Sequence, residues 1–344
     1  MAIFKRYNPL FSSSSSLFSR LQALILEQKR WTHAYSGESA AGEVREASSG
    51  FRLREGSIDA STWRTVDSRT FGIRRSAISS PIWTVLKILQ GQGFEAYLVG
   101  GCVRDLILGR TPKDFDVVTT ATLEQIKNQF HRSIIIGRRF PICLVYIFST
   151  KIEVSSFETT HIDAQHGQMI LFSQMPNSCD KKDFVRWKDC MRRDFTINGL
   201  FYDPFVNTIY DYADGIRDVM ASEVRTVIPA HLSFTEDCAR ILRGLRIVAR
   251  LGLRFSEDTA TAVQDLCSSI ITLDKPRLMM ELNFMLAYGA AVPSIRLLQK
   301  YKLLDILLPI QAAYLADQSK QLAGGSSIML MVSCTYNTRH FSPF

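Results

Sequence analysis

Two aspartates separated by one residue, Asp114 and Asp116, have the types and spacing of a metal site. In a strand, residues two apart point to the same face, so the two carboxylates would lie side by side while Phe115 enters the core. Adjacent negative charges are costly unless a cation lies between them, and hard divalent cations prefer oxygen ligands. The pair therefore predicts a divalent-cation site. A solvated turn is the common alternative for an isolated Asp-x-Asp.

A glycine pair follows a short apolar run upstream, where residues 98–105 read LVGGCVRD. This pattern predicts a strand that passes through Gly100 and Gly101 into a helix carrying Arg104. Backbone N–H groups without side chains around them can approach a phosphate, and Arg104 adds a positive charge one helical turn later. The segment predicts a phosphate-binding turn. The alternative is a purely structural tight turn, and the G-x-G-x-x-G spacing of dinucleotide-binding proteins is absent.

A further carboxylate, Asp194, follows Arg192 and Arg193 at the entrance to an apolar segment. A carboxylate beside two guanidinium groups could complete a metal cage and clamp a phosphate. An ion pair that caps an element is the alternative. Glu153, within the strand expected at 152–157, is a candidate third carboxylate for the metal, unless it lies on a solvated strand face.

Arginines at every third position of one expected helix predict a basic stripe, formed by Arg240, Arg243 and Arg246. Apolar residues recur on another side of the same helix. Glu236 and Asp237 fall at its expected N-terminal turn, where the helix dipole favours acids. Aspartate acceptors and arginine donors on one rim are the groups that recognition of a base edge requires. A charged helix face in water is the alternative.

A small set of elements must hold these residues in place. The spacing of apolar residues predicts helices at 81–89 and 103–108. Short apolar runs between turn residues predict five strands, at 96–99, 115–119, 133–136, 142–148 and 152–157. Beyond Ser233 the apolar spacing is almost wholly helical. The sequence therefore predicts a compact head of helices and strands, followed by a helical region.

The four motifs, in this order and spacing, resemble those of class II tRNA nucleotidyltransferases and bacterial-type poly(A) polymerases, within the DNA polymerase β nucleotidyltransferase superfamily. The resemblance covers roughly residues 96–309 and includes 275–282 and 303–309, which look like the helical RNA-binding neck. It implies an α+β fold: a polymerase β-like head, with a small mixed sheet and flanking helices, followed by an all-helical neck.

The resemblance also implies a role for each motif. Asp114 and Asp116 would bind two Mg²⁺ ions, with Mn²⁺ as a possible substitute, and Asp194 matches a catalytic carboxylate assigned in the poly(A) branch. The nucleotide would be held by a larger set, namely Gly100, Gly101, Arg104, Arg193, Asp237, Arg240, Arg243 and Arg246. Within that set, Asp237 and Arg240 would read the base edge, and Gly101 and Arg104 would hold the triphosphate.

The implied activity is template-independent addition of AMP from ATP to RNA 3′ ends. Residues 137–140, GRRF, are similar to the poly(A) branch of the family. Addition of CCA to tRNA, which uses CTP as well as ATP, is the alternative. An alternative of another class is a catalytically inactive, truncated RNA-binding protein. ATP and an RNA 3′ end are the expected partners, and no obligate protein partner is expected.

The composition is that of a globular protein, with 46% hydrophobic and 22% charged residues and a net charge of +8 over 344 residues. This excludes collagen-like, disulfide-scaffold and fully disordered classes. No apolar run approaches the roughly 18 residues that a membrane span needs, so no membrane partner is expected. Seven scattered cysteines without a C-x-x-C pair indicate neither a zinc site nor a disulfide framework.

The two ends of the sequence differ from its middle. The first 31 residues contain one acid, Glu27, a serine run at 12–16 and scattered basic residues, which is typical of an organelle transit peptide. A disordered tail is the alternative. We expect four parts: a transit peptide and disordered linker at 1–78, the head at 79–225, the neck at 226–310, and an irregular, apparently truncated C-terminus at 311–344. The expected location is a mitochondrion or a plastid.

Overall fold

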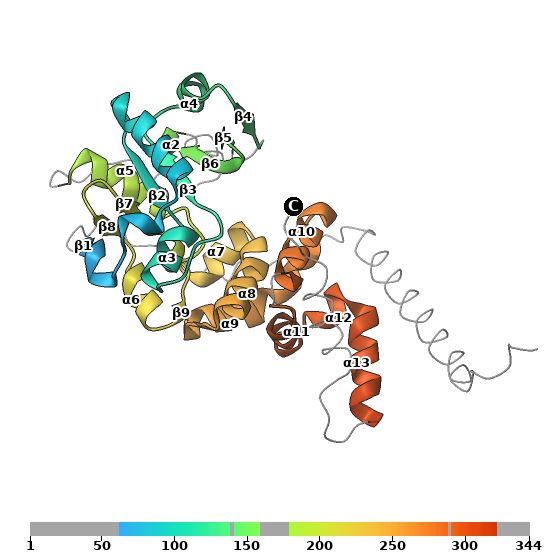
Figure 1. Ribbon diagram of the computed structural model, residues 1–344. Coiled ribbons are helices and arrows are strands. Elements are labelled where there is room, and N and C mark those ends of the chain that lie inside the picture. The colour runs from blue at the N-terminus through green and yellow to red at the C-terminus, as the bar shows by residue number, and fades with distance from the viewer. Residues whose placement is uncertain (1–61, 138–140, 159–178, 288–289, 322–344) are drawn as a thin grey trace, which may run out of the picture.

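The computed structural model describes residues 62–137, 141–158, 179–287 and 290–321. A head built on one β-sheet leads into a succession of helices that extends away from it (Figure 1). The expected transit peptide lies outside the described residues, and so does most of the expected linker. Among the helices that the structure describes, none is long and apolar enough to cross a bilayer.

The head contains an eight-stranded mixed sheet with the strand order β1-β8-β7-β2-β3-β6-β5-β4. Its strands are β1 (Arg64–Asp67), β2 (Ala96–Val99), β3 (Asp116–Thr119), β4 (Ser133–Ile136), β5 (Ile142–Ile147), β6 (Thr150–Ser156), β7 (Phe201–Asp203) and β8 (Thr208–Asp211). All neighbouring strands are antiparallel except β3 and β6, which run parallel. The five predicted strands are confirmed, with ends shifted by at most two residues.

Helices cover both faces of this sheet. The helices of the head are α2 (Ser80–Gly91), α3 (Gly101–Ile107), α4 (Leu123–Gln129), α5 (Lys181–Cys190) and α6 (Gly215–Met220), with short 3₁₀ turns that include η6 (Thr196–Asn198). Residues of β2 alternate between two cores: Leu98 packs with α2, and Tyr97 packs on the other side with Trp187 of α5. Because both faces are covered, every residue of β2 is buried.

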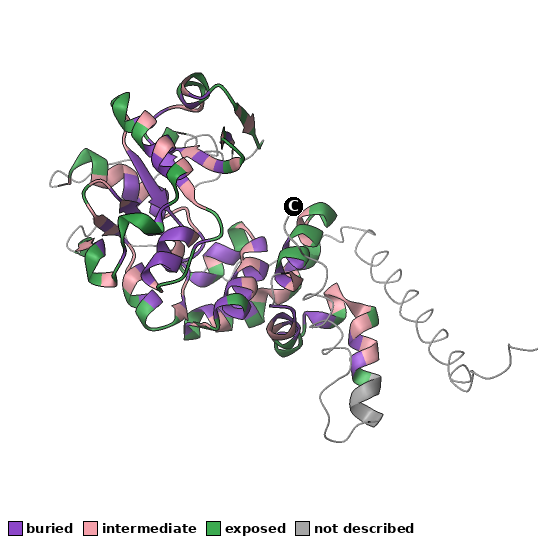
Figure 2. Ribbon diagram, in the orientation of Figure 1, coloured by how far each residue is buried: buried purple, intermediate pink, exposed green. Residues whose placement is uncertain are grey.

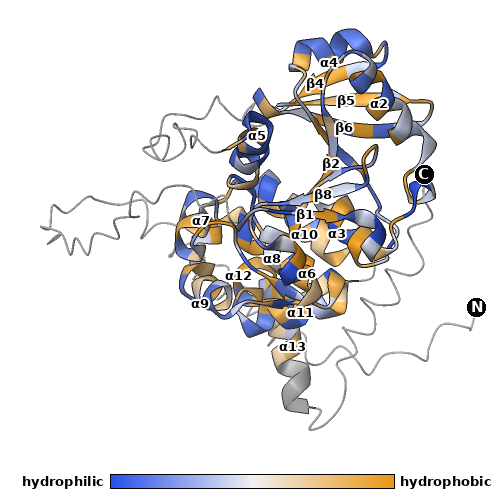
Figure 3. Cartoon of the chain, turned by 90° about the vertical axis from the view of Figure 1, so that its left-hand side faces the viewer, coloured by the Kyte–Doolittle hydropathy of each residue, from blue (hydrophilic) through white to orange (hydrophobic). Residues whose placement is uncertain are grey.

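Figures 2 and 3 show how the buried and apolar residues are distributed. Buried residues concentrate on the central strands and on the inner sides of the helices. In Figure 3, apolar residues gather on β4 and β5, whereas β6 is mixed and α5 is largely hydrophilic. The sheet therefore has a continuous apolar interior, which gives its central strands a rigid frame for polar side chains at their ends.

The neck is helical, as the spacing predicts. It comprises α7 (Ala230–Glu236), α8 (Ala239–Leu251), α9 (Glu257–Leu266), η7 (Cys267–Thr272), α10 (Lys275–Leu286), α11 (Ala291–Lys300), α12 (Leu304–Leu307) and α13 (Pro309–Gln321). A two-stranded parallel pairing of β9 (Glu223–Val224) with β10 (Arg254–Phe255) ties the end of the head to the turn after α8. Helix α8 packs against α7, α10 and α11, so it forms the centre of the neck.

The structure differs from the expectation at both ends of the described chain. Residues 64–67, expected to belong to a disordered linker, form β1 and pair with β8 at the edge of the sheet. This strand is half-exposed and reads RTVD, so its composition resembles that of a linker. At the other end, residues 311–321, expected to be irregular, belong to α13, whose buried Ala312 and Leu315 share one side.

Candidate active site

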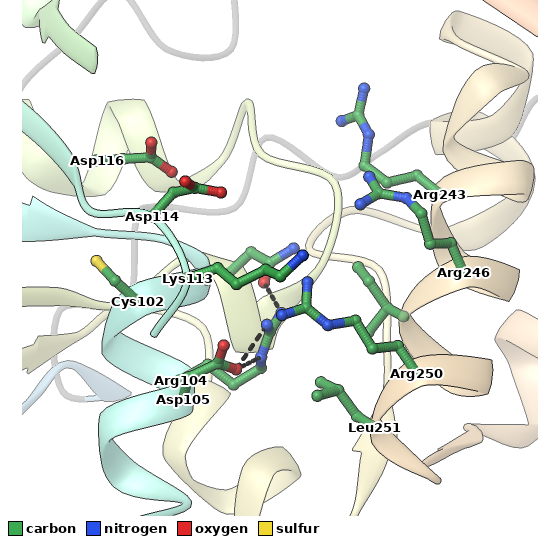
Figure 4. Close-up of a pocket in the computed structure, with 13 residues that line it drawn as sticks. Cys102, Arg104, Asp105, Lys113, Asp114, Asp116, Arg243, Arg246, Arg250 and Leu251 are labelled. Carbon is green, nitrogen blue, oxygen red and sulfur yellow. Dashed lines mark hydrogen bonds and ion pairs between the residues drawn. The ribbon is translucent and has the colours of Figure 1, made fainter. Parts of the chain in front are cut away.

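Asp114 and Asp116 lie next to each other, although only one of them belongs to a strand. Strand β3 begins at Asp116, and Asp114 lies in the turn before it. Their carboxylates nevertheless project toward the same space and line the same cavity (Figure 4). Phe115 between them packs against the main core, as predicted. The prediction of two neighbouring carboxylates is therefore confirmed, while the strand is shorter than expected.

The electrostatics of this pair favour a cation. Burial and the negative charge of Glu153 raise the pKa of Asp116 to about 6, with Asp114 adding to the rise and Arg193 opposing it. Glu153 lies opposite Asp116 in the parallel register of β3 and β6. A carboxylate that resists ionisation because of like-charged neighbours gains stability from a bound cation, so the residues present fit a divalent metal ion.

Glu153, the predicted third metal ligand, lies beside the pair but forms an ion pair of its own. Its Oε1 is 3.6 Å from Nζ of Lys151, and both side chains are about half-exposed. Among the residues that the structure describes, no three His, Cys, Asp or Glu side chains form a ready-made metal cluster. The structure therefore brings two carboxylates together for a cation and places Glu153 on the neighbouring strand.

The glycine turn between β2 and α3 is confirmed, and Gly100 has a specific reason to be glycine. Its φ of +78° lies in a region that side chains rarely adopt. A Cβ there would lie 3.5 Å from a guanidinium nitrogen of Arg193 and 3.7 Å from Oδ2 of Asp116. Gly100 thus leaves open the space between a predicted nucleotide-binding arginine and a predicted metal ligand. Gly101 begins α3 and lines the cavity.

Arg104 is buried in the wall of the cavity rather than exposed at the helix surface. It donates to Oδ1 of Asp105 at 2.9 and 2.7 Å and to Oδ1 of Asn198 at 2.8 Å. These charge-assisted hydrogen bonds fix the plane of the guanidinium. Arg104 therefore lines the site predicted for it with its orientation already set.

Arg193 and Asp194 occupy different environments. Arg193 forms an ion pair with Asp189 of α5 at 2.8 Å and lies behind the glycine turn, outside the lining of the cavity. Asp194 is buried and accepts hydrogen bonds from the backbone N–H of Phe195, from Asn198 at 3.1 Å and from Arg243 at 3.1 Å.

Asp194 thus connects the head to α8 through its ion pair with Arg243. Burial opposes its ionisation, but the Arg243 guanidinium and the hydrogen bond from Asn198 hold the pKa of Asp194 below its ordinary value. The described contacts of this carboxylate are those of a capping ion pair, which is one of the two interpretations of the sequence. Its catalytic role stays a prediction.

The basic stripe on α8 is confirmed for Arg243 and Arg246, and its buried partner is a glutamate of α10. Glu281 is 3% exposed, and its two oxygens lie 3.8 Å from Nε of Arg243 and 3.2 Å from Nε of Arg246. Both arginines line the cavity opposite the aspartates. Five side chains therefore connect the two parts of the chain, which we call the head–neck link: Arg104, Asn198, Asp194, Arg243 and Glu281.

Asp237 and Arg240, the predicted base-reading pair, lie outside the lining of this cavity. Asp237 follows α7 instead of starting α8, and its Oδ2 accepts a hydrogen bond from Arg277 at 2.7 Å. Arg240 donates to Oγ of Ser233 at 2.8 Å and to the backbone carbonyl of Arg192 at 3.2 Å. Both side chains already have partners in this structure, so base reading by this pair stays a prediction.

The cavity has a volume of about 240 Å³ and lies between α3, the turn before β3, and α8 (Figure 4). Its polar and charged lining residues are Arg104, Asp105, Lys113, Asp114, Asp116, Asn198, Arg243, Arg246 and Arg250. Asp114 and Asp116 lie on one side, and the guanidinium groups that α8 contributes lie on the other. A polyphosphate with a bound cation matches this distribution of charge.

The lining residues that were not singled out from the sequence include Lys113, Asn198 and Arg250. Arg250 continues the basic stripe one helical turn beyond Arg246, so extending the periodicity would have found it. Lys113 precedes Asp114, and burial together with the Arg250 charge holds the pKa of Lys113 below its ordinary value, although Asp114 opposes this shift. Asn198 carries no signal in the sequence, because only its contacts to Arg104 and Asp194 reveal its place. Residues 138–140, part of the GRRF segment, lie outside the described chain.

Comparisons with known proteins match two parts of the chain to described families. The sequence matches the family described as poly A polymerase head domain over residues 96–225. Residues 252–315 match the family described as the probable RNA and SrmB-binding site of polymerase A. The first match contains the carboxylate pair and the glycine turn, and the second contains α10.

Individual relatives are of two kinds. The chain is 36% identical over 262 residues to a poly(A) polymerase I of Haemophilus influenzae, covering 75% of this chain and 58% of the relative. It is 32% identical over 225 residues to a CCA-adding enzyme of Leuconostoc mesenteroides, covering 65% of this chain and 53% of the relative. The chain thus spans little more than half the length of these relatives.

A solved structure supports the same fold. The crystal structure of the Bacillus stearothermophilus CCA-adding enzyme in complex with CTP is similar, with a TM-score of 0.54 and 27% identity over 66% of this chain and 53% of that one. The expected mixed-sheet head with flanking helices and the helical region after it are confirmed. The chain belongs to the nucleotidyltransferase family that contains bacterial poly(A) polymerases and CCA-adding enzymes.

Proposed function

We propose that the chain is an RNA 3′ nucleotidyltransferase that adds AMP from ATP to the 3′ end of RNA. The observation that carries this proposal is the cavity between the head and α8. It places Asp114 and Asp116 on one side and the guanidinium groups of Arg243, Arg246 and Arg250 on the other. The family membership supplies the reaction class, and the cavity supplies groups suited to it.

Different side chains of the cavity would bind the cation and the phosphates. Asp114 and Asp116 would hold Mg²⁺, which when bound supplies charge neutralisation and activates the attacking hydroxyl. Arg104 and the arginines of α8 offer fixed donors to the phosphate oxygens, where negative charge develops during transfer. In the reaction the RNA 3′-hydroxyl would lose its proton to water and its oxygen would bond to the α-phosphorus of ATP. The bond between that phosphorus and the α–β bridging oxygen would break, and pyrophosphate would leave.

ATP is the preferred substrate in this proposal, and CTP is the alternative. The preference is supported by the higher identity to the Haemophilus poly(A) polymerase, 36% against 32% for the Leuconostoc CCA-adding enzyme. CCA addition to tRNA is supported by the structural neighbour, which is a complex with CTP. Incubation with a generic RNA and with a tRNA lacking its CCA end, each with labelled ATP or labelled CTP, distinguishes the two. Incorporation of CTP into the tRNA alone would indicate CCA addition.

The catalytic proposal is tested by nucleotide incorporation with Mg²⁺ and with EDTA. We expect incorporation only with the metal, and we expect Asp114→Asn and Asp116→Asn to abolish it, because shape is kept while the charge that holds the cation is lost. Asp305→Asn on α12 is the matched control, since Asp305 is exposed and distant from the cavity lining. Binding of RNA without any incorporation by the unchanged chain would instead support an inactive RNA-binding protein.

We further propose that the chain acts in a mitochondrion or a plastid. The proposal is supported only by the acid-poor, serine-rich and basic composition of the first 31 residues. Fusion of residues 1–78 to a fluorescent protein, compared with a fusion of residues 79–344, tests it. Organelle fluorescence from the first fusion is the expected result, and diffuse fluorescence from both would contradict the proposal.

A further inference from the structure

Helix α10 exposes apolar side chains next to the cavity. Met279, Met280 and Phe284 are 53%, 46% and 43% exposed. The opposite side of the helix is already packed, because Leu282 and Met285 are buried in the main core. These exposed side chains therefore do not belong to the core of the neck, and Figure 2 shows exposed residues along this helix.

One of these side chains is in contact with the cavity through an arginine. Cζ of Arg246 lies 5.6 Å from the centre of the Phe284 ring. The same guanidinium is paired with Glu281 at 3.2 Å and lines the cavity that contains Asp114 and Asp116. Arg246 thus lies between the aromatic ring and the space where phosphates would bind.

An exposed ring beside arginines has the chemistry of a single-stranded nucleic-acid site. Proteins bind single-stranded nucleic acids with positively charged side chains that follow the sugar–phosphate backbone and with aromatic side chains on which the bases stack. Every base has a π-face, so stacking needs no particular sequence. Here Arg243, Arg246 and Arg250 supply the charge, and the acid nearest to them on α10, Glu281, is buried and engaged with two of them.

We propose that Phe284, held by Arg246, is a stacking platform for one base near the 3′ end of the RNA. This inference rests on the proposed function, because it takes RNA as the partner of the cavity. The ring positions the strand so that the terminal ribose faces the aspartates, while the arginines of α8 contact phosphates. Met279 and Met280 extend the same apolar surface by one helical turn.

The test measures RNA binding by fluorescence anisotropy with a labelled oligo(A) RNA of 12 nucleotides. Phe284→Leu keeps an apolar side chain and removes the ring, and Phe284→Tyr keeps the ring. The matched control is Phe148→Leu, since Phe148 is 83% exposed on the turn between β5 and β6. Base–aromatic stacking contributes about 1–3 kcal/mol, so Phe284→Leu should weaken binding about tenfold. Phe284→Tyr and Phe148→Leu should bind as the unchanged chain does.

A second set of RNAs, with an abasic residue at each of the last three positions in turn, locates the stacked base. With one of these RNAs the tenfold difference between Phe284→Leu and the unchanged chain should disappear. The slope of affinity against salt should stay the same, because stacking releases no counterions.

Two results would overturn the proposal. One is that Phe284→Leu weakens binding equally with every abasic RNA. The other is that Phe284→Leu leaves RNA binding unaltered but changes the oligomeric state, which would make the surface a protein interface. The incorporation assay separates this inference from the proposed function. If the chain binds RNA through Phe284 but adds no nucleotide, the stacking proposal is supported and the proposed enzymatic function is contradicted.

Discussion

Replacing Asp194 by asparagine separates a structural role of this residue from a catalytic one. The substitution keeps the shape and the acceptor that faces the Phe195 N–H, but removes the charge that faces Arg243. Of its ion-pair partners among the described residues, Arg243 would then retain Glu281, whose oxygen is 3.8 Å from its Nε. The head–neck link would therefore lose its central ion pair.

The expected cost follows from burial. Removing one partner of a buried ion pair costs roughly 3–5 kcal/mol, because the other charge stays desolvated. The side chain of Asp194 is 7% exposed, whereas that of Arg243 is 33% exposed and water can solvate it in part. We therefore expect a loss of about 2 kcal/mol in the free energy of unfolding at pH 7.

The measurement is urea-induced unfolding of the unchanged chain and of Asp194→Asn, with Asp305→Asn as the control. Because the pKa of Asp194 is lowered in the folded chain, its contribution is present above the unfolded pKa of about 4 and is lost as the pH falls through the folded pKa. The difference between the two proteins should be constant from pH 5 to pH 7 and should shrink below pH 4.

A specific result would refute this reasoning. If Asp194→Asn unfolds at the same urea concentration as the unchanged chain but no longer incorporates nucleotides, Asp194 acts in the chemistry, as the family resemblance implies. If instead Asp194→Asn lowers the free energy of unfolding and the remaining folded protein keeps its turnover rate, the Asp194 carboxylate stabilises the contact between head and neck.

Three further predictions concern the neck. Gly244→Ala should lower the free energy of unfolding by about 1–3 kcal/mol, because the added Cβ would lie 2.8 Å from the Phe195 ring. Thermal denaturation measures this loss. An unchanged melting temperature would show that the ring moves aside. Arg250→Gln should raise the KM for ATP about tenfold with little change in kcat, because one charged donor to the phosphates is lost. If Arg250→Gln and the unchanged chain have equal KM values for ATP, Arg250 does not bind the triphosphate. Arg240→Ala should alter the preference among the four nucleoside triphosphates, since a bidentate base contact contributes about 1–3 kcal/mol of discrimination. Slower incorporation with an unchanged preference would assign Arg240 to its contacts with Ser233 and the Arg192 carbonyl.

The sequence predicts five of the eight strands of the sheet, because these five are local patterns. Each is a short apolar run between turn residues, and the glycine pair after β2 marks the start of α3. Pattern alone did not identify β1, β7 and β8. Strand β1, for example, is an edge strand that reads RTVD, and such a strand needs only one apolar side and a partner distant in the sequence. Its pairing with β8 is a tertiary property.

The part of the site that the sequence predicts also consists of local patterns. Asp114, Asp116 and the arginine stripe on α8 follow from spacing within one element. The partners of these residues come from other elements, as Asn198 does for Arg104 and Glu281 does for Arg246. Spacing within an element contains no information on such contacts. The residues that fix the orientation of the cavity's arginines were therefore missed, while six of the thirteen residues that line the cavity were found.

The head–neck link has a consequence for how the two parts of such a protein can be recombined. Asn198 and Asp194 come from the head, and Arg243 and Glu281 come from two helices of the neck. A chimera that joins this head to the neck of a relative must keep both halves of this junction, or it buries an unpaired charge beside the cavity. The head and the neck are therefore exchangeable only as a matched pair, and the main hydrophobic core, which continues from the sheet into the neck helices, adds to this requirement.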